Sequence, residues 1–92
     1  MSQYSKGANF ERLAQKFLED EGAFVIRSAG SHSPVDLIAL WNEDCPWLIQ
    51  CKLDGSLSSR EAQTLTILAG DKSCKAFMAT KQGKDIVWVR YA

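Results

Sequence analysis

An acid, an amide and a lysine are spaced in this chain so that they could act together on a phosphodiester. Asp36 lies in the apolar run Val-Asp-Leu-Ile-Ala-Leu, and Gln50 and Lys52 follow the next apolar run, Trp-Leu-Ile. Side chains on a strand alternate between its two faces, so Gln50 and Lys52 project to the same side. With Asp36 on a neighbouring strand, they would bring two oxygen ligands and an ammonium group together. Such a group can hold a hard cation and position a water, which favours a metal-dependent nuclease.

Asp36 also has a purely structural interpretation. An acid within an apolar strand needs a partner, and the nearest candidate is Lys52 in a simple ion pair. Paired charges with shifted pKa values mark functional sites and structural ion pairs alike. Spacing alone does not favour either interpretation of Asp36, the functional or the structural one.

The composition predicts one globular domain over residues 1–92. The chain is 46% apolar and 24% charged, which is too apolar for disorder. Its formal net charge of zero counts mildly against nucleic-acid binding, since such proteins usually carry excess Lys and Arg. The polar N-terminus predicts no signal peptide, and no apolar stretch is long enough to span a membrane. Three widely spaced cysteines fit neither a disulfide framework nor a zinc site, so we expect structural thiols in a reducing cytoplasm.

The elements that must position these residues are expected in the order αβββαββ. Apolar residues recur at helical spacing in the first segment, where Gly22 is a plausible C-terminal cap, and Glu11 lies at the edge of the apolar stripe. Ser58 and Glu61 have the spacing of a capping box, and the helix that they start should stop at Gly70. The expected helices are 8–21 and 58–70, and the expected strands are 23–28, 35–41, 47–53, 75–80 and 86–91.

The strand expected at 35–41 is apolar at nearly every position. A strand of this kind is typically central and covered on both faces. The last two strands are expected to form a hairpin with Gly83 in its loop. One α/β domain accounts for the whole pattern.

Several short motifs together resemble the archaeal-type (Hjc-like) Holliday junction resolvases of the PD-(D/E)XK nuclease superfamily. The resemblance covers residues 6 to about 53, with the motifs in the family's order and at matching intervals. Beyond residue 53 only the general plan of a helix followed by strands agrees. The motifs are Lys6-Gly7-Ala8, Glu11-Arg12, Arg27-Ser28-Ala29-Gly30-Ser31, Val35-Asp36-Leu37 and Gln50-Cys51-Lys52.

The resemblance implies a restriction-endonuclease-like core, a mixed sheet flanked by helices, that works as a two-fold symmetric homodimer. It implies hydrolysis of opposed strands of a four-way DNA junction, in DNA recombination and repair, with Mg²⁺ as the normal cofactor and Mn²⁺ able to substitute. By position, Asp36 is the central metal-binding acid, Gln50 occupies the second acid position and Lys52 is the catalytic lysine. Glu11, an acid on a helix, and the backbone carbonyl of Cys51 complete the metal site.

The resemblance also implies DNA contacts. Arg12 and Arg27 match basic residues that the family uses on the DNA backbone, and Ser31 matches a position close to the scissile phosphate. Lys6, in the first motif, is assigned to DNA binding with them.

Gln50 departs from the family pattern, which usually has glutamate at this position. An amide still offers a carbonyl oxygen to magnesium but removes one negative charge, so metal affinity should fall and the need for Glu11 should rise. Two alternatives therefore stay open. One is another endonuclease of the superfamily, acting on flaps or nicking DNA. The other is a catalytically impaired module that binds branched DNA without cutting it.

Overall fold

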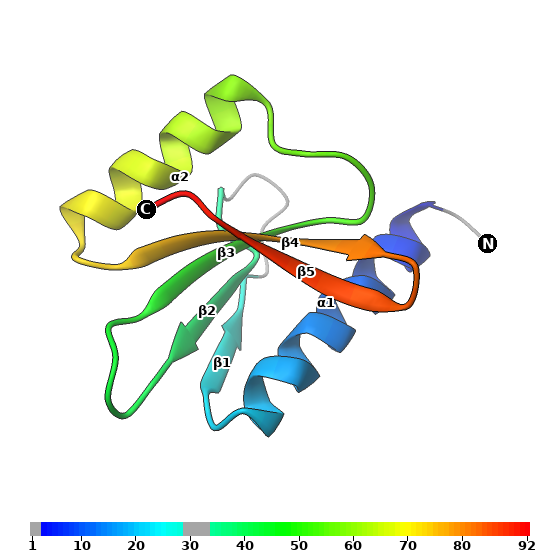
Figure 1. Cartoon of the computed structure of the whole chain (residues 1–92), viewed down its shortest axis with the longest axis horizontal. Coiled ribbons are helices and arrows are strands. Elements are labelled where there is room, and N and C mark those ends of the chain that lie inside the picture. The colour runs from blue at the N-terminus through cyan, green and yellow to red at the C-terminus, as the bar shows by residue number, and fades with distance from the viewer. Residues whose placement is uncertain (1–2, 29–33) are drawn as a thin grey trace.

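A five-stranded sheet with one helix on each face makes up the structure (Figure 1). The computed structural model describes the backbone of residues 3–28 and 34–92, and the side chains from residue 7 onward within those ranges. Neither helix in this described part combines the length and apolar character that crossing a membrane requires. The elements are α1 (Gln3–Asp20), β1 (Phe24–Arg27), β2 (Leu37–Leu40), β3 (Trp47–Lys52), α2 (Ser59–Asp71), β4 (Lys75–Gln82) and β5 (Asp85–Arg90).

The sheet is mixed, and its strands lie in sequence order. The β3–β4 pair is parallel, and the other three pairs are antiparallel. A parallel pair cannot be joined by a tight turn, so α2 forms the crossover between β3 and β4. The predicted mixed sheet, its flanking helices and the order αβββαββ are confirmed.

Two apolar layers hold the helices to the sheet. On one face, α1 buries residues at intervals of four, Phe10, Ala14 and Leu18, against a cluster that includes Leu37 and Ile49. On the other face, α2 buries Leu65 and Ala69 with Leu48, Ala76 and Met78. The predicted stripe of α1 is narrower than expected, since Leu13 and Phe17 remain 53% and 43% exposed.

The expectation that 35–41 is a central strand covered on both faces holds only in part, because Val35 and Ile38 pack with the α2-side cluster but Leu40 does not. β2 lies beside the edge strand β1, and helical cover on the α2 side lies over β3 and β4. Leu40 is therefore 39% exposed and pairs across the sheet with Phe24, which is 68% exposed. Ile26 shares this face and is 43% exposed. An apolar sequence can thus mark an uncovered strand face as well as a buried one.

Helix and turn positions largely follow the local signals. Gly22, with φ of 105°, follows α1 as the predicted cap, and Gly83, with φ of 65°, lies in the tight turn of the β4–β5 hairpin. Glycine adopts a positive φ more readily than residues with a Cβ atom. α1 begins earlier than expected, at Gln3, and α2 runs one residue past Gly70 to Asp71.

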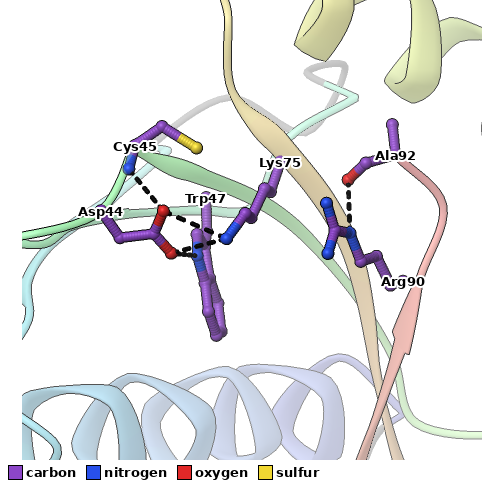
Figure 2. Close-up of polar contacts among 6 residues, drawn as sticks. All are labelled: Asp44, Cys45, Trp47, Lys75, Arg90 and Ala92. Atoms are coloured by element: carbon purple, nitrogen blue, oxygen red, sulfur yellow. Dashed lines mark hydrogen bonds and ion pairs between the residues drawn. The ribbon is translucent and has the colours of Figure 1, made fainter.

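A polar cluster joins the β2–β3 turn to the start of β4 (Figure 2). Asp44 accepts hydrogen bonds from the backbone N–H of Cys45 at 2.8 Å and from Trp47 Nε1 at 3.2 Å. Lys75 Nζ approaches the two oxygens of the same carboxylate at 2.8 and 3.1 Å. These contacts lower the pKa of Asp44 well below its usual range, with the Lys75 hydrogen bond as the largest cause. The cluster therefore fixes where the parallel strand β4 begins beside β3.

Candidate active site

Asp36 lies just before β2, where its backbone bonds to both neighbouring strands. Its N–H donates to the Ile49 carbonyl at 2.8 Å, and its carbonyl accepts from the Ser28 N–H at 2.9 Å. Its side chain also has a backbone partner, because the Cys51 N–H donates to Asp36 Oδ2 at 2.7 Å. The carboxylate is thereby held against the carboxyl end of β3, beside the two other candidate residues of that strand.

The electrostatic setting of Asp36 disfavours its charge. Burial raises the pKa of this carboxyl, and Glu61 raises it further, whereas the Cys51 N–H and Lys52 lower it. A half-buried carboxylate whose charge is only partly compensated by its neighbours is a natural ligand for a cation.

Gln50 and Lys52 lie on the same face of β3, as the alternation of strand side chains predicts. That face carries Leu48 and packs toward α2. Both side chains contact the same oxygen atom, because Gln50 Nε2 and Lys52 Nζ each lie 2.9 Å from Oε2 of Glu61. The structural alternative for Asp36, a simple ion pair with Lys52, is not what the structure shows, because the carboxylate that pairs with Lys52 is that of Glu61.

Glu61 is the residue of this region that the sequence did not reveal as part of the site. Its capping-box spacing with Ser58 was visible and is confirmed at the start of α2. That signal describes only the helix, since no spacing rule connects a helix N-terminus with the end of a strand nine positions earlier. The pKa of Glu61 is lowered to about 2, first by the Ser58 backbone N–H and then by Lys52, so the side chain is an anion at neutral pH.

Glu11 reaches this region from the opposite helix. Burial raises the pKa of Glu11, the negative charge of Asp36 raises it further, and the positive charge of Arg27 lowers it. The two acids and Arg27 thus act on one another electrostatically, as their proposed shared site requires. Cys51 packs with the α1-side cluster, away from Gln50 and Lys52, and its carbonyl belongs to the same strand segment.

The predicted DNA-binding residues are less fully placed. Arg27 is exposed at the end of β1, and Arg12 is exposed on α1 beside Glu11. Lys6 lies in α1, but its side chain is outside the described part, and Ser31 lies wholly outside the described residues.

The oxygen atoms near Asp36 fit a hard cation that the protein would bind through few ligands. No group of three or more His, Cys, Asp or Glu side chains within residues 3–28 and 34–92 is arranged to hold a metal ion. Gln50, as an amide, is not one of these residue types. Its Oε1 atom is buried with no hydrogen-bond partner among the described residues, which leaves an oxygen available to a cation. Magnesium commonly uses one or two carboxylates and retains several waters, so two acids and an amide oxygen suit it.

Comparisons with known proteins agree on one family. The family model for the archaeal Holliday junction resolvases (Hjc) matches residues 2–90. The crossover junction endodeoxyribonuclease Hjc of Methanocaldococcus jannaschii is 61% identical over 36 residues. That match takes in 39% of this chain and only 26% of the Methanocaldococcus protein.

A solved structure extends the likeness to nearly the whole fold. The structure of Archaeoglobus fulgidus Hjc, described as a Holliday junction resolvase from an archaeal hyperthermophile, superposes with a TM-score of 0.79 at 26% identity. The superposition covers 94% of this chain and 73% of the Archaeoglobus chain. The predicted restriction-endonuclease-like core is thereby confirmed.

Proposed function

Because the chain belongs to the family of archaeal Holliday junction resolvases, we propose that it is a metal-dependent endonuclease that cuts four-way DNA junctions. The observation that carries the proposal is the hydrogen bond between the Asp36 side chain and the backbone of β3. The Cys51 N–H holds the Asp36 carboxylate at 2.7 Å, between Gln50 and Lys52 in the chain. We take residues 1–92 to act as one nuclease domain, in the cytoplasm, where its three free thiols would stay reduced.

Each residue of the proposed site has a defined task. Asp36, Glu11, the Gln50 side-chain oxygen and the Cys51 carbonyl would hold Mg²⁺, with Mn²⁺ as a substitute. When bound, the cation supplies Lewis-acid stabilisation of the phosphoryl oxygens and a water of lowered pKa. Lys52 has three N–H donors and uses one on Glu61, so others can stabilise charge on the attacked phosphate.

The DNA backbone would be bound by positive side chains beside the site. Arg27 acts on Glu11 electrostatically and is exposed, so its guanidinium can approach a phosphate near the acids. Arg12 is exposed on the same helix as Glu11. Lys6 and Ser31 complete the proposed DNA-binding set on the strength of the family motifs.

We further propose that two copies act together. Cutting opposed strands of a symmetric junction requires two active sites related by a two-fold axis. The chain offers an apolar strip, Phe24, Ile26 and Leu40, on the face of β1 and β2 that is turned away from α1. A second copy packed on this strip would cover the exposed edge of the sheet.

A second candidate function follows from Gln50. The amide removes one charge from the metal site, which favours a module that binds branched DNA and cuts poorly or not at all. Arg12 and Arg27 would then contribute binding alone. An endonuclease specific for flaps or nicks is the remaining alternative.

Cleavage of labelled synthetic junctions tests the proposal and its alternatives. We expect the protein to introduce paired symmetric cuts in Mg²⁺ or Mn²⁺, to lose them in chelator, and to lose at least about 100-fold of the rate with Asp36→Ala. Flap and nicked duplex substrates with the same arm sequences serve as controls. An intact junction at several pH values and in both metals would refute the enzyme, and activity only after Gln50→Glu is introduced would favour the impaired module. Preferential cutting of flaps would assign the other substrate class.

A further inference from the structure

The carboxylate of Glu61 lies where helix α2 meets the proposed site, and three hydrogen-bond donors contact it. Oε2 accepts from Gln50 Nε2 and Lys52 Nζ, both at 2.9 Å. Oε1 accepts from the Ser58 backbone N–H at 3.0 Å, and the Glu61 N–H donates to Ser58 Oγ at 3.1 Å. The carboxylate is thus fixed by its own helix and in turn touches two residues of β3.

These contacts determine which way the Gln50 amide faces. A carboxylate only accepts hydrogen bonds, so the amide must turn its NH₂ group toward Glu61. The other end of the amide, Oε1, therefore points away from Glu61, and within the part of the chain that the structure describes it is buried without a hydrogen-bond partner. Without this bond the amide could rotate and turn its NH₂ group toward the cation. The partial positive charge of that group would repel the cation.

The same carboxylate restrains Lys52. A lysine has four rotatable side-chain bonds, and an unrestrained ammonium samples many positions. Lys52 Nζ lies 2.9 Å from Glu61 Oε2, the same atom that accepts the hydrogen bond from Gln50 Nε2. The two side chains are therefore oriented together, by one acid that is itself locked in a capping box.

We infer that Glu61 is a positioning residue of the active site, which aims the Gln50 oxygen at the metal and holds Lys52 beside it. This inference rests on the proposed function and explains how an amide can serve at a position where the family resemblance leads us to expect an acid. Position 50 lacks a negative charge, but Glu61, which is hydrogen-bonded to Gln50, carries one. Partners of this kind, one step behind the ligands, commonly affect metal affinity or activity by about 10–100-fold.

Two single variants separate positioning from helix capping. Glu61→Ala removes the contacts to Gln50 and Lys52 together with the cap, and we expect kcat to fall about 10–100-fold. Ser58→Ala is the matched control. It removes the hydroxyl that accepts from the Glu61 N–H but leaves the backbone N–H that holds the carboxylate. We expect Ser58→Ala to lower the Tm while keeping kcat within about threefold of the native chain.

An exchange variant tests the orientation of the amide. Gln50→Glu alone would bring two carboxylates together, which should weaken the site through repulsion. Gln50→Glu combined with Glu61→Gln keeps one amide and one carboxylate in contact and moves the charge to position 50. We expect this double variant to exceed Gln50→Glu alone in cleavage by at least about tenfold.

Two measurements do not depend on cleavage. Calorimetric titration with Mn²⁺ should show binding to Glu61→Ala that is about tenfold weaker than to the native chain, and unchanged for Ser58→Ala. In NMR spectra, the two Gln50 side-chain amide protons should be widely separated in the native chain, and should converge in Glu61→Ala because the hydrogen bond is lost.

The outcomes distinguish this inference from the proposed function. A native chain that cuts junctions together with a Glu61→Ala variant that cuts equally well, with equal Mn²⁺ affinity, would overturn the positioning role alone. A native chain that neither cuts nor binds metal would refute both. A native chain that binds Mn²⁺ without cutting would leave the endonuclease refuted and Glu61 still supported, provided that Glu61→Ala weakens that binding.

Discussion

At the scale of single residues, the site gathers acids whose ionisation opposes folding. The pKa values of Asp36 and Glu11 are both raised, chiefly by burial. A carboxyl whose pKa is raised by folding stabilises the fold below its unfolded pKa, and this contribution is lost as pH rises through the folded pKa. At neutral pH without metal, the acids therefore reduce the free energy of unfolding. Local destabilisation of this kind is typical of sites arranged for binding rather than for stability.

Replacing Asp36 should accordingly separate stability from activity. Asp36→Asn retains an oxygen that can accept from the Cys51 N–H, and it removes the half-buried charge. In metal-free buffer at pH 7 we expect a Tm equal to or above that of the native chain. In Mg²⁺ buffer we expect junction cleavage to be abolished. The difference in Tm should vanish at a pH below the ordinary Asp pKa of 3.8, where the native carboxyl is also neutral. The measurement is thermal unfolding followed by circular dichroism.

The exposed Asp54 provides a matched control, because Asp54→Asn makes the same chemical change outside the site. That variant should unfold like the native chain. A drop of more than about 1 kcal/mol in the stability of Asp36→Asn at pH 7 would show that its charge supports the fold.

The sequence predicted part of this site for a simple reason. Asp36, Gln50 and Lys52 come from neighbouring strands, and alternation along a strand determines which side chains share a face. Glu61 was accessible only as a helix cap, since its contact with β3 depends on how α2 packs on the sheet. The roles of Glu11, Arg12 and Arg27 stay predictions that rest on the family motifs.

At the scale of elements, local sequence signals predicted the ends of the helices better than they predicted which strand faces are buried. The capping box and the glycines at 22 and 83 act over a few residues, and all of them lie where they were expected. The cover of β2 was misjudged because it depends on where α2 lies, which no local pattern of β2 encodes. An extended apolar run therefore indicates a strand but not the number of its covered faces.

The junction between β3 and β4 provides a prediction at this scale. Hydrogen bonds and the charge of Lys75 lower the pKa of Asp44, so its stabilising contribution is present above the unfolded pKa of about 3.8. It is lost as pH falls through the lower, folded pKa. Asp44→Asn should thus reduce the free energy of unfolding at pH 7 modestly, because the pair is partly exposed.

The difference between the native chain and Asp44→Asn should shrink as the pH is lowered below 3.8. Urea unfolding at pH 7, 4 and 2.5 measures it, and raised salt at pH 7 should narrow the gap because the charges are near solvent. A gap that is independent of both pH and salt would point to lost hydrogen bonds from Trp47 and Cys45 rather than to charge.

At the scale of the whole molecule, the exposed edge of the sheet predicts association. Phe24, the most exposed residue of the apolar strip at 68%, should become buried between two copies. Phe24→Asp places a charge there, and we expect the dimer dissociation constant to rise by about 30-fold or more. Light scattering during size-exclusion chromatography, over a range of concentrations, measures this change.

Leu13→Asp is the control, since Leu13 is 53% exposed on α1, which packs on the other face of the sheet. It should leave the oligomeric state unchanged. A native chain that is monomeric at all concentrations would contradict the proposed dimer, and equal effects of both variants would place the interface elsewhere. Loss of symmetric paired cuts in Phe24→Asp would link the dimer to function.

The capping box at the start of α2 also affects how the molecule opens. Helix ends fray at a lower free energy than the core of a sheet unfolds. Because the Glu61 side chain belongs both to this first turn and to the contacts with Gln50 and Lys52, fraying would release two residues of β3 at once. The site is thus tied to one of the more easily opened parts of the molecule. Amide exchange at the beginning of α2 would therefore report how long the site stays assembled.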